Sequence, residues 1–241
     1  MRFRLVTYNI HKGIGGVDRL YRPERIIETL ALCAPDIVLL QEVAEGVPRW
    51  HHDRQVHLIG DALEFRYRAF QPNARLRKGH YGNAILSHFP LSDIHDIELT
   101  VPLKKRRRAL GARCHVHSSQ HSYTVLLFNF HLGLAAFERA IQVRRFLSGH
   151  ALERVRHSTA VVAAGDFNDM WETLGKRQFE QAGFKLASGR SNTFPAFRPV
   201  RPLDAIYIRG NLTVVDSFRY QGPAAKKASD HLPVVADFQL P

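Results

Sequence analysis

The sequence has few cysteines and no long apolar runs, and these shortages exclude several classes of protein. Only Cys33 and Cys114 occur among 241 residues, so we expect no disulfide framework and a reducing compartment. Apolar runs such as 37–40 and 125–128 are far shorter than the ~18 residues that a membrane span needs. Polar residues soon interrupt the first apolar stretch, so we expect no signal segment. A cytoplasmic protein follows.

No linker or low-complexity tract divides the chain. The composition, with 45% hydrophobic and 23% charged residues, is that of an ordinary folded globule. A chain of this length is expected to bury roughly 70–75% of the surface that its unfolded form exposes. We therefore predict a single domain over residues 1–241.

Acidic residues are scarce relative to basic ones. There are 34 Lys and Arg against 22 Asp and Glu, which gives a formal net charge of +12. Such a surface attracts polyanions, whether nucleic acid, an anionic lipid surface or a phosphorylated small molecule. The densest basic block, residues 104–108, is either a solvated turn or the rim of a binding site.

Two units of strand, helix and strand appear along the chain. The first predicts strands at 4–10 and 37–40 with a helix at 23–33 between them, which begins at a proline and carries apolar residues on one stripe. Because strand 37–40 is continuously apolar, both of its faces are expected to be buried. This pattern predicts a sandwich of sheets with helices outside.

The second unit repeats the first. It predicts strands at 123–130 and 159–164 and a long helix at 137–155. In both units an aromatic-Asn-x-His string ends the first strand and an acid ends the second. The Asn and the acid are 33 positions apart in the first unit and 37 in the second. This pseudo-repeat would bring polar strand ends to one edge. Three later strands, at 204–208, 212–215 and 234–238, are spaced as hairpins.

Polar side chains follow the apolar strands at five points. They are Asn9, Glu42, Asp166 with Asn168, Asp204, and Asp230 with His231. Each alone is an ordinary turn residue. Together, carboxylates, amides and an imidazole at one edge are what phosphoester hydrolysis needs, because water requires a base and the leaving alkoxide requires a positive charge. Glu42, assisted by Asn9 and Asp230, is enough to hold Mg²⁺, which keeps most of its water shell.

The motifs that carry these residues resemble those of the endonuclease/exonuclease/phosphatase superfamily, and in particular its short bacterial YbhP-like branch. The motifs are Thr7-Tyr8-Asn9-Ile10-His11, Leu40-Gln41-Glu42-Val43, Gly82-Asn83-Ala84-Ile85-Leu86-Ser87, Asn129-Phe130-His131-Leu132-Gly133, Gly165-Asp166-Phe167-Asn168-Asp169, Leu203-Asp204-Ala205-Ile206-Tyr207 and Ser229-Asp230-His231-Leu232-Pro233. The resemblance implies a DNase I-like α/β (α+β) four-layer sandwich, in which two packed mixed β-sheets carry helices on both outer faces.

The resemblance also implies roles for particular residues. Glu42, Asn9 and Asp230 would hold Mg²⁺, or Mn²⁺ in its place. The catalytic residues would be His231, Asp204, Asp166, Asn168 and His131. Asp166 and Asn168 would orient the attacking water or stabilise the leaving side, Asp204 would hold His231 as base or cationic donor, and His131 would contact the phosphate or act as general acid. Further contacts to substrate are expected from His11, Tyr81, Asn83 and Arg108.

One departure from the family pattern concerns His11. AP endonucleases carry an acid at this position, so an assignment to them is weakened. His11 is either a phosphate contact or a packed histidine at the end of a strand.

The resulting hypothesis is a Mg²⁺-dependent phosphoesterase that cleaves its substrate by in-line attack of water. The alternative is a catalytically inactive protein of the same fold that binds polyanions, and a zinc enzyme is disfavoured because no His-Glu-x-x-His string occurs. The substrate would be nucleic acid, a phospholipid-derived ester or a soluble phosphoester. Arg75, Arg77, Lys78 and the 190–201 stretch would help to bind it. Peripheral contact with the inner membrane is compatible with this charge, and no obligate protein partner is expected.

Overall fold

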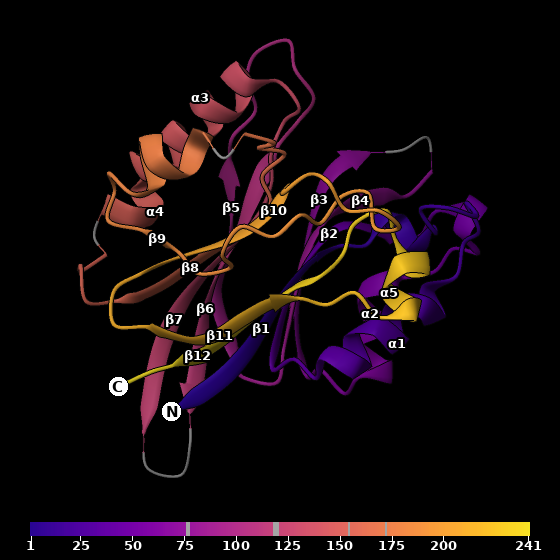
Figure 1. Cartoon of the computed structure of the whole chain (residues 1–241), viewed down its shortest axis with the longest axis horizontal. Coiled ribbons are helices and arrows are strands. Elements are labelled where there is room, and N and C mark those ends of the chain that lie inside the picture. The colour runs from indigo at the N-terminus through magenta and orange to yellow at the C-terminus, as the bar shows by residue number, and fades with distance from the viewer. Residues whose placement is uncertain (76–77, 118–120, 154, 172) are drawn as a thin grey trace.

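Two six-stranded sheets pack face to face between two groups of helices (Figure 1). The computed structural model describes residues 1–75, 78–117, 121–153, 155–171 and 173–241. The first sheet has the order β11-β12-β1-β2-β4-β3, and the second has the order β5-β6-β7-β8-β10-β9. The expected four-layer sandwich is confirmed.

The strands of the first sheet are β1 (Arg2–Asn9), β2 (Ile37–Glu45), β3 (Tyr67–Arg75), β4 (His80–Ser87), β11 (Thr213–Arg219) and β12 (Val234–Gln239). Those of the second are β5 (Leu91–Glu98), β6 (Arg108–His117), β7 (Ser122–His131), β8 (Ala160–Asp166), β9 (Lys185–Leu186) and β10 (Asp204–Arg209). Helices α1 (Pro23–Cys33), α2 (Gln55–Ala62) and α5 (Pro223–Ala228) lie beside the first sheet, and α3 (Ala136–Leu147) and α4 (His150–Glu153) lie beside the second (Figure 1).

The two repeated units form equivalent parts of the two sheets. Strands β1 and β2 are parallel neighbours, and the chain passes through helix α1 between them. Strands β7 and β8 are likewise parallel neighbours, and the chain passes through α3 and α4 between them. In each sheet this parallel pair is central and its outer neighbours are antiparallel. The carboxyl ends of β1, β2, β7 and β8 therefore gather at one edge of the sandwich.

Helix α1 has the predicted bounds because residues that favour the beginning and the end of a helix flank it. Pro23 occupies the first turn, and Ala34 adopts a left-handed conformation immediately after Cys33. Ile26, Leu30 and Cys33 are buried against the sheet, and the two large side chains contribute roughly 1.5–3 kcal/mol each when fully buried.

The long helix predicted at 137–155 is wrong. The chain forms two helices there, α3 and α4, with a break at Ser148 and Gly149. The Ser148 hydroxyl donates to the Arg144 carbonyl, and glycine disfavours the helical interior. These two residues give the break a local cause.

The expected hairpin between the strands near 204–208 and 212–215 is also wrong. Strand β10 pairs with β8 and β9, whereas β11 belongs to the other sheet and pairs with β12. Ile206 and Ile208 of β10 are buried between the sheets, while β11 is a partly exposed edge strand. The different burial of the two strands explains why they separate.

None of the helices in the described ranges is long and apolar enough to cross a bilayer.

A buried polar network joins the two sheets behind the edge where the strands end. The Gln41 amide donates to Asn129 Oδ1 at 2.7 Å, and the Asn129 amide donates to the carbonyls of Leu40 and Ala84 at 2.8 and 2.9 Å. Asn129 and Gln41 are fully buried. The second Asn of the repeat is thus a bridge between sheets, not a group at the surface of the edge.

We predict that Asn129→Ala lowers the free energy of unfolding by about 3 kcal/mol, because it removes three buried hydrogen bonds between the sheets at roughly 1 kcal/mol each. Urea unfolding measures the change. The matched control is Asn211→Ala at an exposed position, which should alter stability little. Equal stabilities of the two variants would contradict a bridging role.

Candidate active site

Polar side chains from both sheets meet at the edge where the parallel strands end. Asn9 ends β1, His131 ends β7 and Asp166 ends β8. Asp204 begins β10 and is paired in register with Asp166, because β10 runs antiparallel to β8. His231 follows in the loop before β12. The structure therefore brings together most of the residues predicted from the strand ends.

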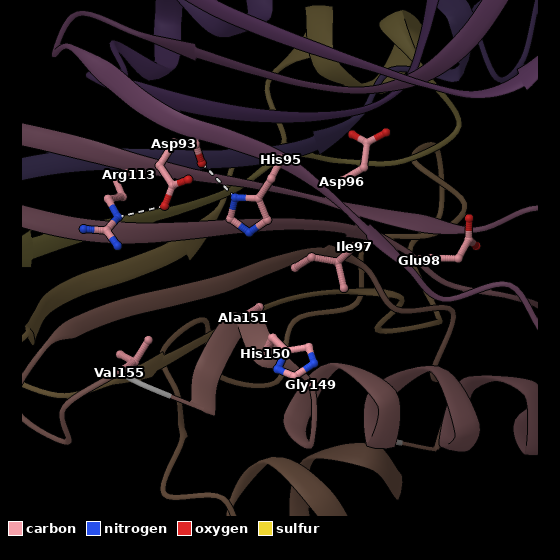
Figure 2. Close-up of a pocket in the computed structure, with 10 residues that line it drawn as sticks. All are labelled: Asp93, His95, Asp96, Ile97, Glu98, Arg113, Gly149, His150, Ala151 and Val155. Carbon is pink, nitrogen blue, oxygen red and sulfur yellow. Dashed lines mark hydrogen bonds and ion pairs between the residues drawn. The ribbon is translucent and has the colours of Figure 1, made fainter.

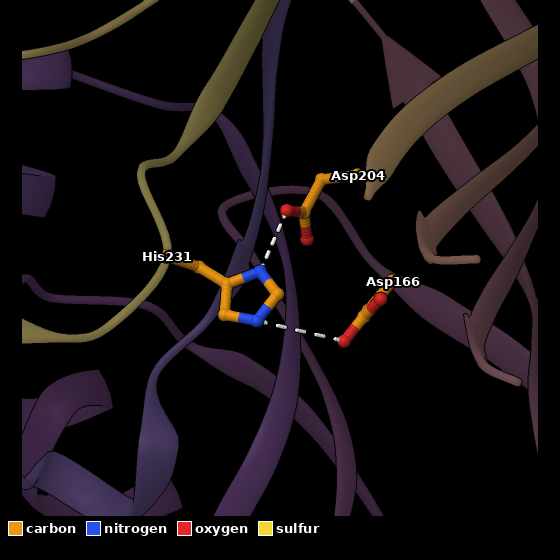
Figure 3. Close-up of side chains that lie close together, drawn as sticks. All are labelled: Asp166, Asp204 and His231. Atoms are coloured by element: carbon orange, nitrogen blue, oxygen red, sulfur yellow. Dashed lines mark hydrogen bonds and ion pairs between the residues drawn. The ribbon is translucent and has the colours of Figure 1, made fainter. Parts of the chain in front are cut away.

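His231 is held between two carboxylates (Figure 3). Its Nδ1 donates to Asp204 Oδ2 at 2.7 Å, and its Nε2 lies 3.8 Å from Asp166 Oδ2. The Thr193 hydroxyl donates to the same oxygen of Asp204, and the ring of Phe194 lies 5.1 Å from that of His231. These contacts fix the tautomer and the orientation of the imidazole.

Asp166 makes a second polar contact between the two halves. Asn9 Nδ2 donates to Asp166 Oδ2 at 3.0 Å, and the Asn168 backbone N–H donates to Oδ1 at 3.0 Å. His131 Nε2 lies 3.7 Å from Oδ2. The preceding Gly165 is required, since a Cβ there would lie 2.1 Å from the Phe130 carbonyl oxygen.

These carboxylates and imidazoles have strongly shifted pKa values because they are buried together. Burial and the neighbouring Asp204 raise the pKa of Asp166. Burial would lower the pKa of His231, but Asp204 and Asp166 raise it to about 10. Burial and the charge of Arg107 lower the pKa of His131 to about 3. At neutral pH, His231 is therefore the cationic imidazole and His131 the neutral one.

Glu42 is directed into the site by a bulge in β2. The register of β2 with β4 shifts between Leu40 and Val43, and Glu42 has a φ of 55°, a conformation that few non-glycine residues adopt. Burial raises the pKa of Glu42, but His131, Lys12 and His11 lower it more, to about 2. Glu42 is therefore ionised.

Lys12 is a site residue that the sequence analysis missed. Its ammonium forms an ion pair with Glu42 and lies 5.2 Å from the centre of the Tyr81 ring. Tyr81 is thus near the site, as expected. The available signal was the position of Lys12, directly after the Asn9-x-His11 string.

Asp230 and His11 lie together beside the end of β1. His11 Nδ1 is 3.8 Å from Asp230 Oδ1 and interacts with the Ile14 carbonyl at 3.1 Å. The backbone N–H of His11 donates to Asn9 Oδ1. The Ser229 hydroxyl donates to the Asn9 carbonyl at 2.7 Å. Ser229, which had no predicted role, ties the loop that carries His231 to β1.

Two predicted substrate contacts are not brought into the site. Asn83 is fully buried, and its amide donates to the Arg108 carbonyl at 3.1 Å and to Gln71 Oε1 at 3.3 Å, so it has a structural position between strands. The Arg108 guanidinium is paired with Asp96 and the Pro72 carbonyl. In the structure both side chains are engaged by neighbouring strands.

The remaining basic residues have mixed outcomes. Of the 104–108 block, Lys104, Lys105 and Arg106 are exposed, whereas Arg107 is buried. Arg77 and the side chain of Arg75 lie outside the described residues. The block is therefore not one continuous rim.

The donor set at this edge suits a divalent ion. Among the residues that the structure describes, Asp166, Asp204 and His231 are the one group of three whose ligand atoms lie within 4.8 Å of one another. Glu42 adds an ionised carboxylate on the side of Lys12. The carboxylate oxygens of this set fit a hard cation such as Mg²⁺, whereas the protonated ring of His231 has no lone pair to offer it.

A groove of about 530 Å³ between β5 and α4 has no comparable arrangement of polar groups (Figure 2). Arg113 is paired with Asp93 at 3.0 Å, and His95 Nδ1 interacts with the Asp93 carbonyl at 2.7 Å. These groups satisfy one another along the exposed strand β5. The strand-end cluster is therefore the candidate active site.

Known proteins have sequences and folds similar to those of this chain. The "Uncharacterized protein YbhP" of Escherichia coli (strain K12) is 27% identical over 250 residues, which cover 99% of this chain and 96% of that protein. An endonuclease/exonuclease/phosphatase from Beutenbergia cavernae matches with a TM-score of 0.79 at 22% identity, over 99% of this chain and 72% of that one. The human Nocturnin catalytic domain, solved with a bound sulfate anion, matches with a TM-score of 0.77 at 22% identity, over 100% of this chain and 95% of that one.

A family model matches the part of the chain that carries the strand-end cluster. Residues 6–231 match the Endonuclease/Exonuclease/phosphatase family, and this range includes the cluster from Asn9 to His231. The chain therefore belongs to the endonuclease/exonuclease/phosphatase family, whose members typically cleave phosphoester bonds.

Proposed function

We propose that this protein hydrolyses a phosphoester by in-line attack of water, with Mg²⁺, or Mn²⁺ in its place, as its metal ion. The observation that carries the proposal is the continuous buried set Asn9, Asp166, His231 and Asp204 beside the ionised Glu42. It offers a carboxylate for water, a cation for a phosphate oxygen and a ligand for metal in one place.

Asp166 is the group best suited to act on the attacking water. Its raised pKa makes it a stronger base than an ordinary carboxylate, and the Asn9 amide and the Asn168 N–H hold its two oxygens in place. Asn168 is held in turn, since its side-chain amide donates to the Leu132 carbonyl at 3.1 Å.

His231 acts as a cationic hydrogen-bond donor to the phosphate. Of the two roles that the family resemblance left open, this one agrees with a raised pKa, because a protonated imidazole has no free lone pair to accept a proton. Asp204 keeps it charged and oriented. The neutral His131 is then available as a second polar contact to the phosphate.

Glu42, Asn9 and Asp230 together would hold the metal ion. Members of this family generally use a divalent metal. When bound, the ion neutralises phosphate charge and stabilises the leaving oxygen. Lys12 supplies a further positive charge on the same side through its ion pair with Glu42.

The substrate we propose is nucleic acid or a phospholipid-derived ester, because its anionic extension would match the exposed cations Lys104, Lys105 and Arg106. Trp171, which is 79% exposed, and Phe197, which is 59% exposed, offer stacking or interfacial surfaces. The solved zebrafish TDP2 complex with a single-strand DNA product has the same fold, with a TM-score of 0.70 at 19% identity. We further propose a cytoplasmic enzyme that contacts anionic membranes only peripherally, in keeping with its two free cysteines.

The alternative is an inactive polyanion-binding protein of the same fold. The intact set of Glu42, Asp166, Asp204 and His231 argues against it, since buried charges are costly to retain without a role.

We expect Glu42→Gln to lower kcat/KM at least ~100-fold, because a lost metal ligand removes several kcal/mol of charge stabilisation. Hydrolysis of bis-p-nitrophenyl phosphate with Mg²⁺, Mn²⁺ or EDTA measures it. The exposed Glu28→Gln in α1 is the matched control and should keep wild-type rates. Near-normal turnover in Glu42→Gln would reject the proposed metal ligand, and wild-type protein inactive on diesters, monoesters and DNA would favour the inactive binder.

We expect His231 to keep its proton at pH 8 in the metal-free protein, and Asp204→Asn to lower its pKa. The pKa of His231 is raised from 6.5 to about 10 on folding, so its contribution to stability is fully present below pH 6.5 and is lost as the pH rises through about 10. Imidazole ¹⁵N shifts follow the titration, and Asp216→Asn, at an exposed position in β11, is the matched control. A neutral His231 at pH 8 would contradict the cationic role.

We expect replacement of Lys104, Lys105 and Arg106 by Ser to weaken the salt dependence of binding to single-stranded DNA. The slope of log affinity against log salt should become shallower by about 2, because each lost phosphate contact contributes roughly 0.7. Fluorescence anisotropy measures the slope. The control replaces Arg2, Arg156 and Lys185, exposed cations at the opposite ends of the strands, and removes the same charge. Equal slopes for the two triple variants would show that net charge, not this rim, determines binding.

A further inference from the structure

Large apolar side chains are exposed around the beginning of helix α3, at the edge that carries the candidate active site. They belong to α3 itself and to three loops, which join β5 to β6, follow β7 and follow β8. Together they form the apolar patch, which consists of Leu103, Leu134, Phe137, Met170 and Trp171. Scattered apolar side chains are normal on a protein surface, but a group of them at one place marks a contact with another body.

Arg139, a buried residue of α3, holds two loops of the apolar patch against the helix. Its guanidinium donates to the Leu134 carbonyl, and its Nη2 lies 3.9 Å from Asp169 Oδ1. Asp169 is itself buried and directly precedes Met170 and Trp171 in the chain. The loop after β7 and the loop after β8 are therefore fixed to the same helix, so their exposed apolar side chains lie on one surface.

The third loop, between β5 and β6, presents Leu103 to solvent. Leu103 is fully exposed and has a φ of 64°, a left-handed conformation that is costly for leucine and that burial within this chain does not offset. Arg145 of α3 donates to the Thr100 carbonyl in this loop, and the Lys104 ammonium lies 5.2 Å from the centre of the Phe137 ring. The loop is thus held beside α3 with its leucine directed away from the protein.

Cations beside the apolar patch favour an anionic partner. Lys104, Lys105 and Arg106 directly follow Leu103 and are exposed. Exposed apolar side chains with Lys and Arg beside them are the combination that enters the headgroup region of an anionic bilayer. A surface for single-stranded nucleic acid would offer aromatic rings on which bases stack, whereas three of the five residues of the patch are leucine or methionine. The composition of the patch therefore favours a bilayer over nucleic acid.

We propose that the apolar patch docks on an anionic lipid bilayer, with its side chains among the headgroups and residues 104–106 against the lipid phosphates. The inference rests on the proposed function and adds the partner on which that function takes place. Two loops of the patch directly follow His131 at the end of β7 and Asp166 at the end of β8. Docking by these loops therefore turns the candidate active site toward the phosphates of the bilayer.

The sequence provides an intrinsic probe of this contact. Trp171 lies in the apolar patch, and the second tryptophan, Trp50, is buried. The anionic probe is a vesicle of phosphatidylglycerol and phosphatidylcholine in equal parts, the neutral probe is a vesicle of phosphatidylcholine alone, and EDTA is present with both. On anionic vesicles we expect the Trp171 emission to shift to shorter wavelength and to be quenched by brominated acyl chains. Emission that anionic vesicles leave unchanged overturns the inference.

Replacement of Leu103, Leu134 and Phe137 by Ser should weaken co-sedimentation with anionic vesicles at least about tenfold, because less apolar area enters the interface. The matched control makes the same change at three exposed apolar positions outside the patch, Leu32, Tyr67 and Val215, and should keep wild-type affinity. Equal affinities of the two triple variants overturn the inference. If the patch variant fails to fold, Leu103→Ser, at a fully exposed position, carries the test with an expected loss of several-fold.

Other occupants of the apolar patch give different results. If the patch binds nucleic acid, the patch variant loses affinity for single-stranded DNA and keeps its affinity for vesicles. If the patch binds a second copy of this chain, the wild-type protein sediments as a dimer that does not bind vesicles, and the patch variant sediments as a monomer. Either result overturns docking on a bilayer.

Hydrolysis of bis-p-nitrophenyl phosphate, a soluble diester, separates the inference from the proposed function. The patch variant should keep wild-type rates on this diester, because its substitutions remove no group of the candidate active site. Wild-type protein that hydrolyses the diester but does not bind vesicles overturns only the docking. Wild-type protein that binds vesicles through the patch but hydrolyses no phosphoester overturns only the proposed function.

Discussion

The hydrogen bond from Asn9 to Asp166 is the contact on which the site depends. It joins the last residue of β1 to the last residue of β8, and so connects the two sheets at the edge where substrate would bind. Both side chains are almost fully buried, where an unmade hydrogen bond is costly. Gln41 and Asn129 form a second buried bridge behind it. Two polar bridges therefore restrict movement of one sheet relative to the other, and the distances between the side chains of the site are maintained.

Charge within the site is distributed unevenly, and this asymmetry separates the roles of chemically similar residues. His231 and His131 are both buried, yet His231 is flanked by Asp204 and Asp166 while His131 lies near Arg107. Opposite neighbours shift their pKa values in opposite directions. Glu42 and Asp166 diverge in the same way, because Lys12 stabilises the charge of one and Asp204 opposes the charge of the other. Two imidazoles and two carboxylates thus provide four different groups.

The sequence predicted the location of the site better than its supporting contacts. Asn9, Asp166 and Asp204 could be found because apolar strands end at polar residues, and parallel strands that cross over through helices must end at the same edge. Thr193 and Ser229 could not, since each matters only through a hydrogen bond to a residue distant in sequence. The helix break at Gly149 reflects the low helix propensity of glycine, and the separation of β10 from β11 reflects which strands they pair with in the folded protein. The periodicity of apolar residues predicts neither.

The basic block illustrates why a charge run cannot be interpreted as one feature. Its first three residues are exposed. The backbone of Arg107 is hydrogen-bonded to the Thr100 hydroxyl, and Arg108 begins strand β6 and pairs with Asp96. Salt screens exposed charges over about 10 Å at 0.1 M, but it screens a buried guanidinium much less. The exposed and the buried members of the block therefore respond differently to salt. A net charge of +12 conceals this division, because it weights every cation equally wherever the fold places it.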